Sequence, residues 1–150
     1  MAISLYFGED VSSEVRAAIE DGLAEHAAQA RVAPREVRPL SVVARNDSAE
    51  VIAGLLGRTV WGWLHISELW VHELHRRNGI GRQLMSAAEH VAIDRGCHAA
   101  YLDTFDFQAL PFYERLGYSR VGVLKDFPPG HSRVFLEKRL QSFAPPNKSL

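Results

Sequence analysis

The segment from Thr59 to Arg95 changes its hydrophobic period once, and this change constrains the fold more than any other feature of the chain. The part up to Val71 is rich in β-branched and aromatic residues and contains no proline, which predicts one long, largely buried strand. From Gly81 the apolar residues recur at helical spacing, and Gly96 stands where a left-handed cap ends a helix. We therefore expect a strand, a short connector and then a helix from about Gly81 to Arg95.

The connector is basic and contains two glycines separated by one residue. It reads Arg76, Arg77, Asn78, Gly79, Ile80, Gly81 and Arg82. The first turn of a helix leaves backbone N–H groups unpaired and carries the positive end of the helix dipole, and glycines let a ligand approach the main chain. With the arginines, this pattern predicts a diphosphate site. The same residues also fit an ordinary turn with solvated arginines, although neither a P-loop nor a complete dinucleotide fingerprint is present.

The remaining chain alternates between short apolar runs and helical patterns. Before the connector we expect a strand at Ile3 to Phe7, an amphipathic helix carrying Val11 to Leu23, and a hairpin of Leu40 to Ala44 with Val51 to Leu56. After the helix we expect a strand at Ala99 to Thr104, a short helix at Leu110 to Leu116, and strands at Tyr118 to Leu124 and Ser132 to Leu140. This order predicts one mixed α/β domain over residues 1–150, antiparallel in its first half, with a frayed tail from about residue 142.

Composition narrows the class of partner. The chain has 150 residues, 47% of them hydrophobic, and a formal net charge of -1, which suits one globular domain and provides no field strong enough to hold nucleic acid or a membrane surface. Cys97 is the single cysteine, so an internal disulfide is impossible. No apolar run is long enough to cross a bilayer, and the first ten residues lack the pattern of a secretory signal. We expect a cytoplasmic protein.

Two motifs together resemble the GNAT superfamily of N-acetyltransferases. The family turn, [Q/R]-x-x-G-x-[G/A], is matched from Arg76 to Gly81. A second signature, an alanine followed by a tyrosine and a leucine-glycine-aromatic ending, is matched from Ala109 to Tyr118. The resemblance is close from Thr59 to Leu140 and rests on element order before that. It implies the GNAT fold, a twisted, largely antiparallel mixed sheet of about seven strands with three to four helices.

The resemblance also implies a reaction and its residues. The donor would be acetyl-CoA, and the acceptor a primary amine of a small molecule or peptide. In the family, the pantetheine arm pairs with the backbone at positions matched here by Trp70 and Val71, while the diphosphate binds at Arg76 to Arg82. Tyr113 matches the general acid, and a phenol with an ordinary pKa near ~10 can protonate a leaving thiolate. A structural aromatic is the alternative for Tyr113.

The general base is open between two residues of the long strand. Glu68 would lie beside the acetyl group and is our first candidate, although strand alternation could turn it away. His65 is the rival, since its ordinary pKa suits proton transfer near neutrality. Asp106 departs from the asparagine of many family members, and could contact a cationic substrate or cap the short helix instead of binding the coenzyme.

Other residues bear on the acceptor. Asp103, Asp106 and Asp126 fall near strand ends and suggest an acidic mouth for an amine, although aspartates are also common in turns. Arg133 could bind an anionic group of the substrate or pair with a surface acid. Trp61 and Trp63 should share one side of a strand, in the core or at an oligomer face, and a homodimer is possible.

The histidines lack metal-binding spacing, so we expect no metal, and Cys97 after the helix is a poor nucleophile. A non-catalytic acyl-CoA sensor with the same fold is the alternative function.

Overall fold

In the computed structural model of the protein, residues 1–140 are described, and the predicted frayed tail lies outside them. The chain divides into two compact units, Met1–Arg35 and a second that begins at Glu36. In the first unit, helix α1 (Ser13–Gln29) begins after Ser12, whose hydroxyl oxygen accepts a hydrogen bond from the Val15 N–H at 3.2 Å. The strand predicted at residues 3–7 is not formed, because an apolar run becomes a strand only where a neighbouring strand takes its backbone hydrogen bonds.

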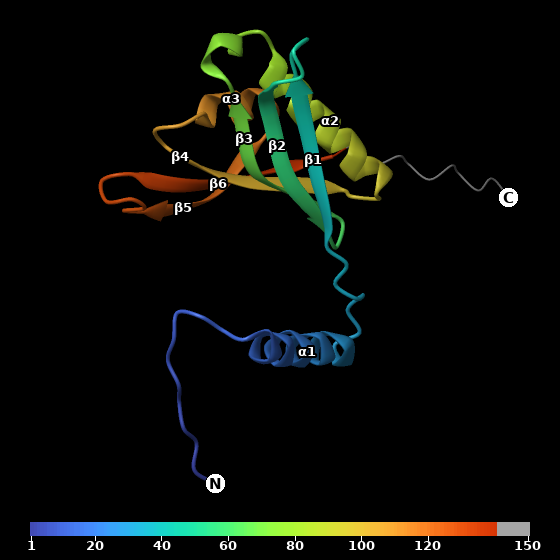
Figure 1. Ribbon diagram of the computed structural model, residues 1–150, viewed down its shortest axis with the longest axis vertical. Helices are drawn as coiled ribbons and strands as arrows, with labels where there is room; N and C mark the ends of the chain where they lie inside the picture. Colours follow the sequence, from blue (N-terminus) through green and yellow to red (C-terminus); the bar gives the residue numbers. More distant parts are fainter. Residues whose placement is uncertain (141–150) are drawn as a thin grey trace, which may run out of the picture. The chain divides into compact units, whose positions relative to one another are not determined.

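The second unit is built on a six-stranded mixed sheet in the order β1-β2-β3-β4-β6-β5, rather than on the seven strands expected (Figure 1). The strands are β1 (Arg38–Arg45), β2 (Val51–Val60), β3 (Trp63–Val71), β4 (Ala99–Phe105), β5 (Ser119–Lys125) and β6 (Ser132–Arg139). The first three form the antiparallel arrangement predicted for the hairpin region. Within residues 1–140 the only parallel pair is β3 with β4, which are joined through a helical crossover. The mixed α/β class is therefore confirmed.

The run from Thr59 to Val71 is two strands, so its prediction as one was wrong. A tight turn at Trp61 and Gly62, both with positive φ (47° and 78°), reverses the chain between β2 and β3. Trp61 lies in that turn, so it does not share a strand with Trp63. Apolar composition continues through the turn, which is why periodicity alone misses it.

Helices cover one face of the sheet. Helix α2 (Ile80–Asp94) packs against β1, β2 and β3, while α3 (Leu110–Arg115) joins the same hydrophobic core, and η1 (Glu73–His75) is a short 3-10 turn before α2. The largest fully buried side chains in this core are Leu55, Leu64, Met85, Leu102 and Leu136. Because strand side chains alternate, the residues between them point to the opposite side of the sheet, which we call the second face.

The pairing of β3 with β4 ends abruptly. Their register runs only from Trp63 and Ala99 to Ile66 and Leu102. Strand β3 continues to Val71 and β4 to Phe105, so each leaves a stretch of backbone without a partner on its inner edge. The two strands thus open a gap in the middle of the sheet.

Candidate active site

The connector after β3 forms a turn suited to an anion. Gly79 caps α2 in the left-handed region (φ 75°), and no side chain bonds to the N–H groups of the first helical turn. Arg77 also has positive φ (63°). A methyl group added at Gly79 would meet no atom within 4 Å, so space is not what requires glycine there. Backbone conformation requires it, and two exposed arginines, Arg77 and Arg82, flank the turn in the sequence.

Arg76 fastens this turn to the strand before it. Its Nε donates a hydrogen bond to the carbonyl oxygen of Val71 at 3.0 Å. Asn78 adds a longer bond from Nδ2 to the carbonyl oxygen of His75, at 3.5 Å. The guanidinium of Arg76 was expected to bind a diphosphate. One of its N–H groups instead forms a hydrogen bond that positions the turn at the end of β3.

The two sequence motifs meet at Gly81. A methyl group there would lie 3.3 Å from Cζ of Phe112, tighter than an ordinary contact, so glycine allows α3 to press against the start of α2. The ring of Phe112 in turn contacts that of Tyr113, with centroids 5.1 Å apart. This contact brings the predicted proton donor to the same face of the sheet as the turn.

Tyr113 is chemically distinct from its neighbour Tyr118. Both are buried, but the Tyr118 hydroxyl donates to Oε1 of Glu89 at 3.0 Å, whereas the Tyr113 hydroxyl makes no hydrogen bond within residues 1–140. Burial raises the pKa of Tyr113 above its ordinary value, so the phenol keeps its proton throughout the neutral range. A protonated hydroxyl without a protein partner is available to a ligand.

Both candidate bases lie on the second face. Glu68 pairs in register with Leu56 of β2, which points away from the core. Its side chain is exposed and lies beyond Ile66, the last residue of β3 that pairs with β4. His65 is in register with Tyr101, and their rings stack with centroids 4.6 Å apart. The Nδ1 atom of His65 is buried without a partner among the described residues, and burial, helped by Arg58, lowers the pKa of this imidazole. His65 is therefore a neutral base at neutral pH.

The acids of the expected acidic mouth are already bonded. The Arg133 Nε donates to Oδ2 of Asp103 at 2.6 Å. Asp106 accepts from the Ser132 N–H and contacts Nδ1 of His131, both at 3.0 Å, so it neither caps α3 nor stands free. Asp126 accepts a long bond of 3.4 Å from the Gly130 N–H. These carboxylates hold loops and strands together, which leaves no free acidic cluster among these three.

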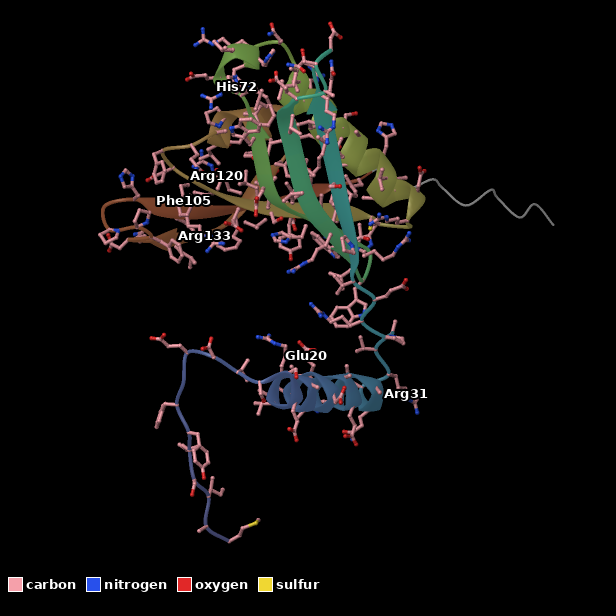
Figure 2. The ribbon with its side chains drawn as sticks, in the orientation of Figure 1. Glu20, Arg31, His72, Phe105, Arg120 and Arg133 are labelled. Atoms are coloured by element: carbon pink, nitrogen blue, oxygen red, sulfur yellow. The ribbon has the colours of Figure 1, made fainter. Side chains whose placement is uncertain are left out.

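Aromatic rings surround the pair of Asp103 and Arg133, and sequence reasoning did not identify them. The Arg133 guanidinium lies 4.9 Å from the ring centre of Phe127 and 5.3 Å from that of Phe135. Arg133 is in register with Phe105, and both are labelled in Figure 2. Phe105 stacks on Phe107 with ring centroids 5.3 Å apart. Because these residues come from three separate segments, no spacing in the sequence signals them.

Comparisons with known proteins agree with this architecture. Residues 9–118 match the model described as the Acetyltransferase (GNAT) family. The chain belongs to the GNAT family of acetyltransferases. It is 40% identical to the acetyltransferase Atu2258 of Agrobacterium fabrum, over 85% of this chain and 92% of that protein. The blasticidin-S acetyltransferase of Streptomyces morookaense is 39% identical, over 70% and 80% respectively.

A solved structure shares the fold. The crystal structure of a putative acetyltransferase from Agrobacterium tumefaciens matches with a TM-score of 0.79 and 37% identity, covering 91% of this chain and 99% of that one. The prediction of the family from two short motifs is thus confirmed, and the protein is an acyltransferase by family and by its relatives.

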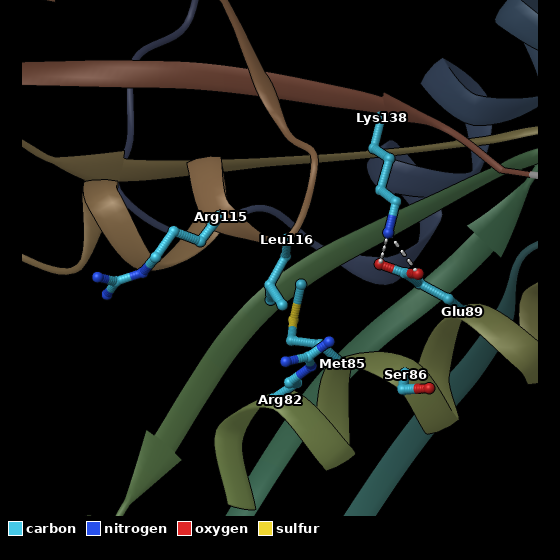
Figure 3. A pocket seen from close by; sticks show the side chains of 7 residues that line it. All are labelled: Arg82, Met85, Ser86, Glu89, Arg115, Leu116 and Lys138. Carbon is cyan, nitrogen blue, oxygen red and sulfur yellow. Dashed lines mark hydrogen bonds and ion pairs between the residues drawn. The ribbon is translucent and has the colours of Figure 1, made fainter. Parts of the chain in front are cut away.

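The GNAT chain also has a cavity of about 220 Å³ between α2, α3 and β6, which sequence reasoning missed (Figure 3). Its walls carry Arg82, Met85, Ser86, Glu89, Arg115, Leu116 and Lys138. The Nζ atom of Lys138 pairs with both oxygens of Glu89, at 2.9 and 3.1 Å. One of its lining residues, Arg82, directly follows the glycines of the turn before α2.

Other chemistry finds less support among residues 1–140. There, no group of three or more histidine, cysteine or acidic side chains could hold a metal ion, and no helix is long and apolar enough to cross a membrane. Cys97 is buried, and burial raises the pKa of its thiol, which disfavours the nucleophilic thiolate.

Proposed function

We propose that this GNAT enzyme transfers the acetyl group of acetyl-CoA directly to a primary amine of a small molecule or peptide. The gap between β3 and β4 is the observation that carries the proposal. It offers unpaired backbone for an extended ligand, and it has the anion-binding turn at one end and the buried Tyr113 on the helical face.

The coenzyme follows the elements around the gap. Its diphosphate meets the free amides of residues 79–82, with Arg77 and Arg82 as counter-charges. Its pantetheine arm pairs with the unpartnered edge of β3 at Trp70 and Val71, as an added strand would. This course directs the thioester toward the point where β3 and β4 separate.

The transfer needs three events at that point. The amine nitrogen attacks the thioester carbonyl, a C–N bond forms, and the C–S bond breaks as the tetrahedral oxyanion collapses. The ammonium proton leaves through the base, and the hydroxyl of Tyr113 gives a proton to the departing sulfur. Because α2, α3 and the coenzyme occupy one face of the sheet, the amine approaches from the second face, where Glu68 and His65 lie.

We assign the role of general base to Glu68, acting through water. Glu68 is exposed and lies beyond Ile66, where the pairing of β3 with β4 ends. His65 is the rival, and a matched pair of variants separates them. Glu68→Gln should lower kcat/KM by about 10-fold at neutral pH, since general-base catalysis contributes on the order of 10²-fold or more when fully engaged. His65→Gln should leave the rate within about 2-fold. The base is His65 if His65→Gln, and not Glu68→Gln, lowers kcat/KM. The pH profile of kcat/KM for His65→Gln should then also lack an ionisation below pH ~6.5.

The acceptor class is tested by a panel of amines. The relative that acts on blasticidin S supports a small-molecule amine, so the panel pairs blasticidin S with amino sugars, polyamines and peptide N-termini. Release of free CoA and the mass of the product are measured. Acetylation of at least one amine is expected. Tight CoA binding without thiol release from any amine favours the acyl-CoA sensor instead.

A further inference from the structure

The cavity between α2 and α3 carries an excess of positive charge that no residue from 1 to 140 neutralises. Of its charged walls, Lys138 and Glu89 neutralise each other. Arg82 and Arg115 make no hydrogen bond, ion pair or ring contact within residues 1–140. Two unpaired guanidiniums on one hollow favour an anion, and arginine matches phosphate oxygens in geometry as well as charge.

The cavity begins beside the coenzyme turn. Arg82 is in the first turn of α2, directly after Gly81, whereas Glu89 lies seven residues further along the same helix, about 10 Å away at 1.5 Å per residue. The ion pair of Lys138 with Glu89 therefore lies at the far end of the cavity. In Figure 3, Arg82 and Arg115 lie on the opposite side of the cavity from this ion pair. The cationic end is the one adjacent to the diphosphate site.

The coenzyme supplies a matching group. Coenzyme A carries a third phosphate, a monoester on the 3′ oxygen of the same ribose that bears the diphosphate. That phosphate must lie within one sugar ring of the turn, on whichever side the ribose enters. The cavity has two arginines on its walls that are unpaired within residues 1–140, and its volume of about 220 Å³ has room for a phosphate and part of the nucleoside.

We propose that this cavity receives the ribose 3′-phosphate, with Arg115 as the discriminating residue and Arg82 shared between it and the diphosphate. The inference rests on acetyl-CoA being the donor. Binding of the 3′-phosphate in this cavity makes the enzyme selective for coenzyme A over carriers that end in the same pantetheine arm but lack this phosphate. Helix α3 then takes part in donor recognition as well as carrying Tyr113.

Isothermal titration of the full chain with CoA and with 3′-dephospho-CoA tests the proposal without needing the acceptor. The wild type should bind CoA about 10-fold more tightly, the value of one to two partly solvated charge-assisted contacts. Arg115→Gln should weaken CoA binding by about 10-fold and leave dephospho-CoA binding within about 2-fold. The preference should also fall as ionic strength rises.

Arg120→Gln is the matched control. It removes the same charge from β5, where Arg120 pairs with exposed Glu114 at 3.0 Å and does not line the cavity, so the preference should persist. Equal binding of the two ligands by the wild type, or equal weakening of both by Arg115→Gln, overturns the proposal. Either result leaves acetyl transfer intact, whereas failure of the amine panel with normal discrimination here overturns only the proposed reaction.

Discussion

The two sides of the gap between β3 and β4 are built in different ways. On the helical side, the groups offered to a ligand have no side-chain partner among residues 1–140. They are the first-turn amides of α2, the hydroxyl of Tyr113 and the guanidiniums of Arg82 and Arg115. On the second face, by contrast, Arg133 is already paired with Asp103 at 2.6 Å, and Glu68 is the exposed carboxylate assigned to the base. The helical side is ready to bind a ligand of fixed structure, whereas a charged acceptor must compete with an existing ion pair.

This difference teaches which part of the site tolerates change. Backbone amides and a left-handed glycine are held by the fold, so the coenzyme side depends on conformation. The second face depends on side chains from β4, β6 and two loops, any of which can be exchanged without disturbing a helix. We therefore expect substitutions on the helical side to reduce catalysis with every amine, and those on the second face to change which amine is preferred.

The largest effect should come from Tyr113→Phe. Loss of the proton donor should lower kcat about 100-fold with every acceptor and leave the KM for acetyl-CoA within about 2-fold. Because burial raises the pKa of Tyr113, the wild-type kcat should show no decline from tyrosine ionisation through the neutral range. Steady-state kinetics across pH measure both.

Tyr118→Phe is the control for that change. Its hydroxyl bonds to Glu89, so the variant should lose stability, by about 1–3 kcal/mol for a bond to a charged group, but keep its kcat. If Tyr113→Phe and Tyr118→Phe lowered kcat equally, Tyr113 would be a packing residue.

An intermediate effect is expected for Gly79→Ala. An alanine held at φ 75° costs about 1–2 kcal/mol, and its methyl group enters open space at the start of α2 that the proposed diphosphate would occupy, so the KM for acetyl-CoA should rise about 10-fold. Gly96→Ala imposes the same backbone cost at φ 84°, also with nothing within 4 Å, but lies after the far end of α2. If both variants lose the same thermal stability but only Gly79→Ala raises the KM, the effect at Gly79 comes from ligand contact and not from backbone strain. If the KM changes equally in both variants, Gly79 does not lie at the diphosphate site.

The smallest effect should come from the ion pair on the second face. Asp103→Asn leaves the Arg133 charge unbalanced and should raise the KM for a cationic amine about 3-fold, while Arg133→Gln frees the carboxylate and should lower it by a similar factor. CoA affinity should not move in either variant. Changes in the same direction for both would place the pair outside the acceptor site.

The helical side could be predicted from the sequence because its determinants are local. The strand end at Val71, the glycines and the start of α2 fall within a few residues, and each has its own compositional signal. The second face could not be predicted, since the contact of Asp103 with Arg133 depends on the register of β4 with β6, 30 residues apart. The turn at Trp61 and Gly62 was hidden inside an apolar run, and the segment at residues 3–7 has strand composition without a strand partner.

The close contact of Gly81 with Phe112 joins the two sequence motifs, which lie about 30 residues apart in the chain. The family turn permits alanine at the position of Gly81, but here the added methyl group would lie 3.3 Å from the Phe112 ring, which would have to shift slightly. Natural variation at the two positions should therefore be correlated, with alanine at 81 accompanied by a residue smaller than phenylalanine at 112. In directed evolution of this enzyme, alanine at 81 should be better tolerated when position 112 also carries a smaller side chain.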